Sequence, residues 1–231
     1  MAEILNRQNQ KTLLIDLDPQ GSLSFAVETK SNNLTIYNVL KGDVKAKDVL
    51  QTTPSGDIIT ANNSLHGADL EFNATGREYL LREAISDIKK QYKYVIIDCP
   101  PALGILTINA LVAGDFVVIP ALADVFSLQG MGQLNDSIQS VIKYCNPKLK
   151  IAGILLTKFT QRTNLSQIIK DELNNVTQKM NTKLFNTSIR IAVALQEAQL
   201  QQKCLYEYAL LSTAMEDYKN FVSELEDIIN E

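Results

Sequence analysis

Short apolar runs of strand-forming residues alternate along this chain with longer helical patterns, and that alternation limits the folds open to it. The runs are almost continuously apolar, as expected for strands that are covered on both faces. They are TLLID (12–16), GDIITA (56–61), YVIID (94–98), FVVIP (116–120) and IAGILLT (151–157). Helical patterns lie at about 76–91, 105–113, 127–145, 165–179, 193–202 and 213–229. The alternation predicts an α/β fold: a mostly parallel, doubly wound sheet with helices on both faces.

The composition is that of an ordinary soluble domain. Hydrophobic residues make up 45% and charged residues 21% of the 231 residues, with no internal repeat or linker, so we expect one domain over 1–231. No apolar run approaches the roughly 20 residues that span a bilayer, and the N-terminus has no signal-peptide pattern. Three widely spaced cysteines, Cys99, Cys145 and Cys204, suit a reducing compartment and offer no metal-ligand spacing. These observations predict a cytoplasmic location.

Positive charge is concentrated in one part of the chain. Residues 141–190 contain nine basic and two acidic residues, which leaves −11 on the rest of a chain whose total charge is −4. A basic segment on an acidic protein is typical of a nucleic-acid-binding surface. Solvated helix faces explain the same count equally well.

Carboxylates follow two of the predicted strands. TLLID ends in Asp16 and leads to Asp18, and YVIID ends in Asp98 followed by Cys-Pro-Pro. Ligands of parallel sheets bind at the carboxyl ends of the strands, and an Asp after a hydrophobic strand is the Walker B pattern that holds Mg²⁺. One such strand is a weak signal, whereas two strands with these continuations are far more specific.

These segments resemble ParA/Soj-type partition ATPases, the deviant-Walker P-loop proteins related to MinD. The resemblance runs in family order over nearly the whole chain. It is carried by LLIDLDPQGSLS (13–24), YKYVIIDCPPALGILTINAL (92–111), GDFVVIPALADVFSLQGMGQL (114–134), GILLTKFTQRTNL (153–165), IRIAVALQEAQ (189–199) and AMEDY (214–218).

The resemblance implies a P-loop NTPase-like fold, ATP and Mg²⁺ as ligands, and roles for particular residues. Asp18 would help to position the attacking water, Asp98 would serve Mg²⁺, and Asp16 would support the switch loop. A strand-end residue that caps the following turn is the other reading of Asp16. Nucleotide contacts are implied for Pro19, Gln20 and Arg190, with the 189–195 stretch near the adenine. The family further implies an ATP-bound homodimer, binding to DNA without sequence preference, and a ParB-like centromere-binding partner.

One family element has no counterpart in this sequence. The family's first strand leads into a Lys-Gly-Gly-X-Gly-Lys-Thr loop whose amides and lysines hold the phosphates. Here none of the ten glycines is followed by Lys, and MAEILNRQNQ resembles the end of the family's first helix. We therefore expect an N-terminally truncated domain without its first strand and P-loop, impaired in hydrolysis. We also expect unpaired backbone groups beside YVIID, lower stability and a tendency to associate there.

Three explanations for the missing loop compete. The sequence starts too late or was truncated, the protein is a natural pseudo-ATPase, or another chain completes the sheet. The first is favoured, because Asp18 and Asp98 are both retained. Other departures are Ile191, Ala192 and Ala194, where many family members have Asn or Arg near the adenine, and Gln129, where an acid is common.

Related functions are less compatible with the sequence. MinD-like proteins end in a basic membrane-binding helix, but residues 216–231 carry six acids and one lysine, so we expect no membrane partner. The nitrogenase iron-protein relatives need paired cysteines at a dimer interface to hold a metal cluster. In this sequence no second cysteine offers an evident partner for Cys99, so we expect no cluster. The DNA-binding candidates are chiefly Lys170, Lys179 and Lys183, with Lys143, Lys148, Lys150, Lys158, Arg162 and Arg190 as further ones. The alternative function is a non-catalytic interaction module that binds a ParB-like partner, a ParA-like subunit or DNA.

Overall fold

The structure is a computed structural model that describes residues 1–27, 29–30, 33–160 and 164–231. Two compact units make up the chain, and each is described by itself. The first unit comprises Met1–Gly114 and Ala198–Glu207, and the second comprises Asp115–Glu197 and Tyr208–Glu231. Candidate residue Arg162 lies outside the described residues.

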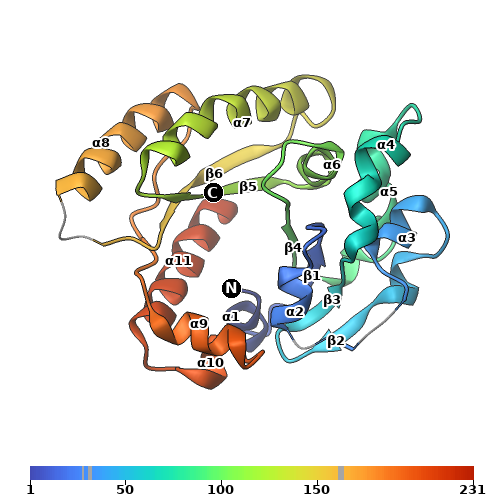
Figure 1. The fold of residues 1–231 in the computed structure, drawn as a ribbon, viewed down its shortest axis with the longest axis horizontal. Coiled ribbons are helices and arrows are strands. Elements are labelled where there is room, and N and C mark those ends of the chain that lie inside the picture. Colours follow the sequence, from blue (N-terminus) through green and yellow to red (C-terminus); the bar gives the residue numbers. More distant parts are fainter. Residues whose placement is uncertain (28, 31–32, 161–163) are drawn as a thin grey trace. The chain divides into compact units, whose positions relative to one another are not determined.

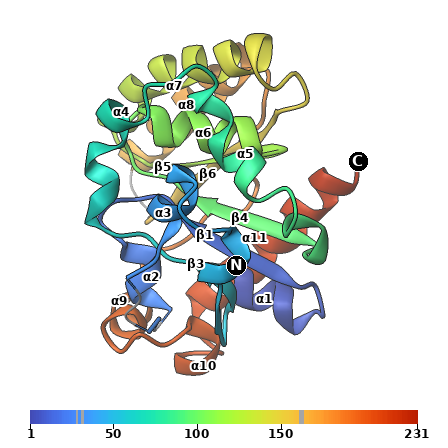
Figure 2. The ribbon, with the colours of Figure 1, turned by 90° about the vertical axis from the view of Figure 1, so that its right-hand side faces the viewer.

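The first unit is built on a sheet with the strand order β2-β3-β1-β4. Its strands are β1 (Thr12–Asp16), β2 (Gln51–Thr53), β3 (Gly56–Ile59) and β4 (Tyr94–Asp98). β1 pairs in parallel with both β3 and β4, and β2 adds an antiparallel edge. Every residue of β1 is buried because this strand lies between two others. β1 and β4 run side by side (Figure 2).

Helices and short 3₁₀ segments pack around this sheet. They are α1 (Ala2–Arg7), α2 (Ser22–Ala26), α3 (Ile36–Lys41), η1 (Ala46–Val49), η2 (Asn63–Gly67), α4 (Ala68–Glu71), η3 (Arg77–Tyr79), α5 (Leu80–Ala84), η4 (Lys89–Gln91) and α6 (Ile105–Ala113). α6 has the predicted bounds. The helix expected over 76–91 is instead split into η3, α5 and η4. Tight bonds such as Ile88 N–H to Ile85 O and Gln91 N–H to Ile88 O replace the α-helical pattern after α5.

The second unit is built on the parallel pair β5 (Phe116–Leu122) and β6 (Lys150–Thr157). A register shift at Val117/Val118 marks a bulge in this pair. Its long helices are α7 (Val125–Tyr144), α8 (Asn164–Lys179) and α11 (Thr213–Asn230), and α7 packs along α8 (Figure 1). The chain passes between the units through α9 (Val193–Leu200) and α10 (Leu205–Tyr208).

The predicted α/β layout is confirmed: the strands are mostly parallel and alternate with helices. The five predicted strands are present, with β3 ending earlier and β5 longer than expected, whereas the short polar β2 was not predicted. β4 stands at one end of its sheet, and its apolar residues are only half-buried. The single-domain organisation and the truncation stay predictions.

Candidate functional site

The carboxyl end of the first sheet gathers three carboxylates. Asp16 and Asp98 are direct partners in the register of β1 and β4, and Asp18 comes two residues after Asp16. The N–H of Leu17 donates to the carbonyl of Asp98 at 2.9 Å, which ties the start of the loop to β4. Parallel pairing therefore brings together residues that are about 80 positions apart in the sequence, at the edge where α/β sheets bind ligands.

Asp16 is completely buried and fully engaged by hydrogen bonds. It accepts from Asp18 N–H at 3.0 Å, from Ser24 N–H at 2.8 Å and from the Ser24 hydroxyl at 2.7 Å. The Ser24 oxygen in turn accepts from Ala61 N–H at 3.0 Å, just after β3. Burial raises the pKa of Asp16, and the bonds from Ser24 and Asp18 counteract that rise. Asp16 thus binds both ends of the 17–23 loop. This contact is compatible with support of a switch loop and equally with a strand-end residue that caps the following turn.

Asp18 and its neighbours form the exposed part of that loop. The half-buried Asp18 accepts from Gln20 N–H at 3.0 Å through Oδ1, and its carbonyl accepts from Gly21 N–H at 2.9 Å. Gly21 has a φ of 64°, a conformation that costs glycine little, and it allows α2 to start at once. Pro19 is half-buried and Gln20 is exposed beside it, so all three predicted loop residues reach solvent.

Asp98 has a perturbed acidity although its side chain is exposed. Loss of hydration beside the surrounding protein is the largest cause that raises the pKa of Asp98, to about 6, and the negative charges of Asp16 and Asp18 add to it. A hydrogen bond donated by Cys99 N–H acts in the opposite direction and lowers the pKa. None of the ion pairs found in the described part of the chain involves these three aspartates. Because the carboxylates of Asp16, Asp18 and Asp98 repel one another, a cation bound among them would be stabilised.

The chemistry of this carboxylate set fits a magnesium ion that also has a phosphate ligand. Mg²⁺ is held in proteins by one or two carboxylates together with waters and substrate phosphates. Among the described residues, no group of three or more His, Cys, Asp or Glu side chains forms a metal cage. Asp98 supplies the accessible carboxylate, whereas the oxygens of Asp16 are taken up by Ser24 and Asp18.

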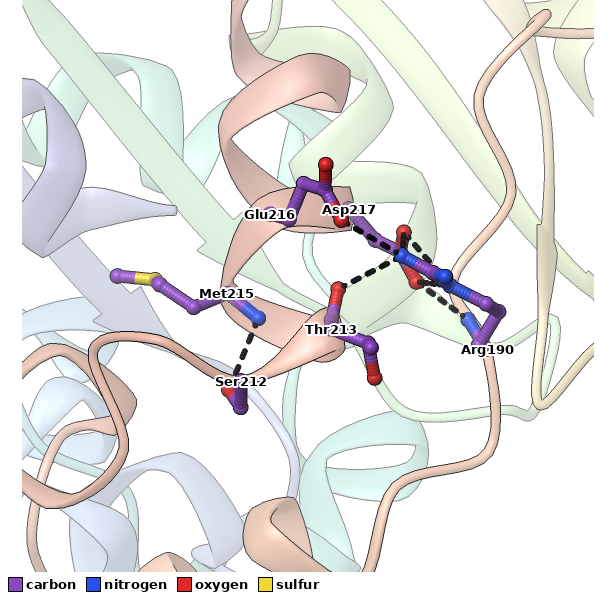
Figure 3. A network of polar contacts seen from close by, with 6 residues as sticks. All are labelled: Arg190, Ser212, Thr213, Met215, Glu216 and Asp217. Carbon is purple, nitrogen blue, oxygen red and sulfur yellow. Dashed lines mark hydrogen bonds and ion pairs between the residues drawn. The ribbon is translucent and has the colours of Figure 1, made fainter.

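Arg190 belongs to the second unit, where α11 carboxylates hold its guanidinium (Figure 3). Its Nε lies 3.0 and 2.9 Å from the two oxygens of Asp217, and Nη2 lies 2.6 Å from Oδ1. Nη2 also contacts Glu216 at 3.1 Å and the carbonyl of Thr213 at 3.2 Å. These bonds, with Asp217 first, raise the pKa of Arg190 above its ordinary value. A nucleotide contact by Arg190 stays a prediction.

The DNA-binding candidates also lie in the second unit. Lys170 is half-buried on α8, Lys179 is exposed at the end of that helix, and Lys183 is exposed just beyond it. The remaining described lysines of the basic segment, Lys143, Lys148, Lys150 and Lys158, are exposed too. The concentration of positive charge seen in the sequence therefore falls within one unit.

Two residues of these networks were not singled out from the sequence. Ser24 had a weak signal, because it closes the LDPQGSLS stretch that begins beside Asp16. Asp217 had none, because 27 residues separate it from Arg190 and nothing in the AMEDY segment indicates an ion pair. Within the described residues, no helix combines the length and the apolar character needed to cross a membrane.

Carboxylates at the ends of adjacent parallel strands define an α/β protein with a ligand-binding edge. The AAA domain family AAA_31 matches residues 1–151. The chromosome partitioning protein ParA of Myxococcus xanthus is 35% identical over 230 residues, 97% of this chain and 80% of that protein. The sporulation initiation inhibitor protein Soj of Bacillus subtilis is 36% identical over 222 residues, 94% and 86% of the two chains. The chain belongs to the ParA/Soj family of partitioning ATPases.

A solved structure supports the same fold. Cobyrinic acid a,c-diamide synthase from Mycobacterium smegmatis, with a bound ATP analogue and magnesium, aligns with a TM-score of 0.76 and 34% identity. The alignment covers 83% of this chain and 77% of that one. This alignment confirms the predicted P-loop NTPase-like fold, and the matches to AAA_31, ParA and Soj confirm the family recognised from the sequence.

Proposed function

We propose that the chain is a single ParA-type ATPase domain that couples ATP binding and hydrolysis to dimerisation and to DNA binding without sequence preference. The observation that carries this proposal is the in-register placement of Asp16 and Asp98, with Asp18 two residues beyond Asp16, at the ligand-binding edge of the first sheet. The relatedness to partitioning proteins over 97% of the chain supports the same function.

In this proposal each carboxylate has a separate task. Asp98, the accessible one, holds Mg²⁺, which when bound supplies charge neutralisation for the phosphates. Asp18 sits on the exposed loop, where its carboxylate orients the attacking water. Asp16 keeps that loop in place through Ser24 and the Asp18 amide. Pro19 and Gln20 line the same loop as nucleotide contacts.

The part of the site that would bind the phosphates lacks the positively charged loop of the family. Phosphoryl transfer depends on positioning and charge neutralisation, and carboxylates alone repel a polyanionic phosphate chain. No glycine of this sequence precedes a lysine, so a P-loop lysine is not among these residues. We infer that residues 1–231 by themselves bind ATP weakly and hydrolyse it slowly.

The partners in this proposal are those of the same family. They are a second copy of the chain, DNA contacted by the lysines of the second unit, and a ParB-like protein that stimulates hydrolysis, all in the cytoplasm. Lys170, Lys179 and Lys183 are the lysines proposed to contact phosphates.

The second candidate is a non-catalytic module that binds a ParB-like partner, a ParA-like subunit or DNA without turnover. The missing Gly-Lys pair favours this candidate for the chain by itself. The two candidates differ in whether a supplied phosphate-binding loop restores nucleotide binding.

The decisive experiment is Mg²⁺-dependent binding of a fluorescent ATP analogue. The chain is compared with a fusion that carries a ParA strand and Lys-Gly-Gly-X-Gly-Lys-Thr loop ahead of Met1. The matched controls are the same fusion with both loop lysines changed to Ala, and with Asp98→Asn. We expect tight binding by the fusion alone, lost in both controls. Tight binding by the chain itself would refute the inferred weakness, and no binding by either protein would favour the non-catalytic module.

A further inference from the structure

The loop of residues 99–104 joins β4 of the first unit to helix α6. It leaves the sheet at the edge where Asp98 presents its exposed carboxylate. The first N–H of this loop, that of Cys99, donates to the same carboxylate. The position of the loop therefore affects the direction in which the Asp98 carboxylate points.

Two consecutive prolines make the first half of this loop stiff. Pro100 and Pro101 each have a fixed φ, so the chain between Cys99 and Ala102 has few conformations open to it. The residue before a proline is restricted as well, which extends the effect to Cys99 itself. A displacement of Ala102 is therefore passed on to Cys99 instead of being absorbed within the loop.

Thr107, in the first turn of α6, holds the far end of the stiff stretch. Its hydroxyl donates to the carbonyl of Ala102 at 2.6 Å, and the carbonyl of Pro100 lies 3.5 Å away. Thr107 is only 7% exposed, so water has little access to replace this contact. The bond fixes the loop where it turns back towards the helix.

Asp69, from a different part of the chain, fixes the last residues of the loop. α6 starts after Gly104, which has no side chain to cap the helix, and Asp69 of α4 supplies the acceptor instead. Its Oδ1 accepts from Ile105 N–H at 2.7 Å. The approach is so close that a Cβ atom at Gly104 would lie 2.6 Å from Asp69 Oδ2. Because α4 packs beside α6 (Figure 1), this cap joins the end of the loop to a second helix.

The middle of α6 is held by Asn109, which makes the helix a firm support for the loop. Asn109 is 1% exposed, and its Oδ1 accepts from Leu81 N–H at 3.0 Å. Its Nδ2 donates to the carbonyl of Arg77 at 2.8 Å. The contacts of Thr107 and Asp69 thus connect the loop to a helix that is itself fixed by buried hydrogen bonds.

We propose that Thr107 and Asp69 are positioning residues that direct the Asp98 carboxylate towards Mg²⁺ through the 99–104 loop. Asp98 itself faces the ligand, whereas the other two act on the loop at Ala102 and at Ile105. This inference rests on the proposed function, because Asp98 receives a metal ion only if the chain binds Mg²⁺ together with a nucleotide. The two residues should then affect the Mg²⁺ requirement of nucleotide binding and not binding in general.

The first test is hydrogen exchange on the nucleotide-free chain. Thr107→Val keeps the shape of the side chain and removes the hydroxyl. We expect amide exchange at Cys99 to rise about fivefold, the effect of losing one neutral hydrogen bond. Thr177→Val is the matched control, because Thr177 is 5% exposed and its hydroxyl donates to the carbonyl of Asn174 at 2.7 Å. Unchanged exchange at Cys99 in Thr107→Val, or an equal rise in the control, overturns the proposal.

The second test separates positioning from a merely structural role. Binding of the ATP analogue is titrated with Mg²⁺ on whichever protein binds it in the fusion experiment. Thr107→Val should raise the Mg²⁺ concentration for half-maximal binding several-fold and leave the affinity measured without Mg²⁺ unchanged. An unchanged Mg²⁺ requirement, or an equal loss of affinity with and without Mg²⁺, overturns the proposal.

A second variant keeps the proposal testable if Thr107→Val does not fold. Asp69→Ala removes the acceptor at the start of α6 and should raise the Mg²⁺ requirement in the same way. Asp48→Ala, the same change at another exposed aspartate of the first unit, is its control and should leave that requirement unchanged. The two outcomes that overturn the proposal are the same as for Thr107→Val.

The proposed function and this inference fail in distinguishable ways. If no form of the wild-type protein binds nucleotide, the proposed ATPase function fails, and the positioning of Asp98 for Mg²⁺ fails with it. The exchange measurement still reports in that case whether Thr107 holds the loop at Cys99. If the wild type binds ATP with Mg²⁺ and the Mg²⁺ requirement is insensitive to Thr107 and Asp69, only the inference about these two residues is wrong.

Discussion

Asp16 and Asp98 are register partners at the ends of β1 and β4, yet their carboxylates lie in opposite environments. Asp16 is completely buried and accepts three hydrogen bonds, whereas Asp98 is exposed and has a pKa of about 6. One position therefore stabilises the loop and the other is available to a ligand. The two aspartates occupy paired register positions, yet one is buried and the other exposed, because β1 and β4 lead into different loops.

Replacing Asp16 tests the structural half of this division. Asp16→Asn leaves donors from Asp18 and Ser24 poorly matched in a buried place, and we expect a loss of about 2 kcal/mol in the free energy of unfolding. The raised pKa of Asp16 shows that burial of its charge also costs energy, but the donors that face the new amide NH2 group, which cannot accept, outweigh that relief. Urea denaturation measures the change. Asp18→Asn, at a half-buried position with one accepted bond, should have a much smaller effect.

The pH dependence of stability tests the environment of Asp98. Its pKa is about 6 in the folded chain against a usual value of 3.8, so the folded chain binds the proton more tightly than the unfolded one. This group therefore adds stability as the pH falls from about 6 towards 4, and that contribution is lost as the pH rises again.

The corresponding variant is Asp98→Asn, which removes the repulsion from Asp16 and Asp18. It should be more stable than the wild type at pH 7 and should show a flatter stability curve between pH 4 and 7, measured by thermal unfolding at low salt. Asp87→Asn, at an exposed position of the first unit, is the control and should follow the wild-type curve. Parallel curves for Asp98→Asn and the wild type would contradict the assigned acidity.

The strands and the carboxylates were predictable because they depend on local pattern. Continuous apolar runs such as TLLID and YVIID predict buried parallel strands, and parallel pairing then requires Asp16 and Asp98 to meet at one edge. The short polar strand β2 has no such pattern, since QTT forms only as the edge partner of β3. Its pairing is set by tertiary context rather than by its own residues.

The network around Arg190 was not predictable from the sequence for a different reason. Arg190 and Asp217 are 27 residues apart and meet only because α11 packs against the 183–190 segment. Either residue alone looks like an ordinary exposed charge. The partners of Asp16 were easier to foresee, because Ser24 lies only eight residues away at the start of a helix.

Gly153 of β6 lies under an aromatic ring, and this contact makes a prediction about packing. A Cβ atom at this position would lie 2.7 Å from the Phe185 ring and 3.0 Å from the carbonyl of Lys183. Gly153→Ala should therefore destabilise the chain by about 1 to 3 kcal/mol, the usual cost of overpacking. Phe185→Leu removes the ring and should lower the additional cost of Gly153→Ala, which a double-mutant cycle in urea measures. Additive effects of the two changes would show that the ring is not the obstacle.

The lysines of the second unit provide a prediction about nucleic acid. If they contact phosphates, DNA binding must weaken steeply as salt rises, because each contact releases counterions. Binding is measured with nucleotide present, on the nucleotide-competent protein, at several salt concentrations. Binding that is insensitive to salt, or absent, would refute the proposed DNA interaction.

The variant that assigns the contacts combines Lys170→Gln, Lys179→Gln and Lys183→Gln. The slope of log affinity against log salt should become shallower by about 0.9 for every one of these lysines that contacts a phosphate. The control makes the same change of charge at exposed lysines of the first unit, Lys47, Lys89 and Lys90. A general electrostatic attraction would shift both triple variants alike, because it depends on total charge. A local contact surface would change the slope only for the first, since the phosphates lie against the second unit.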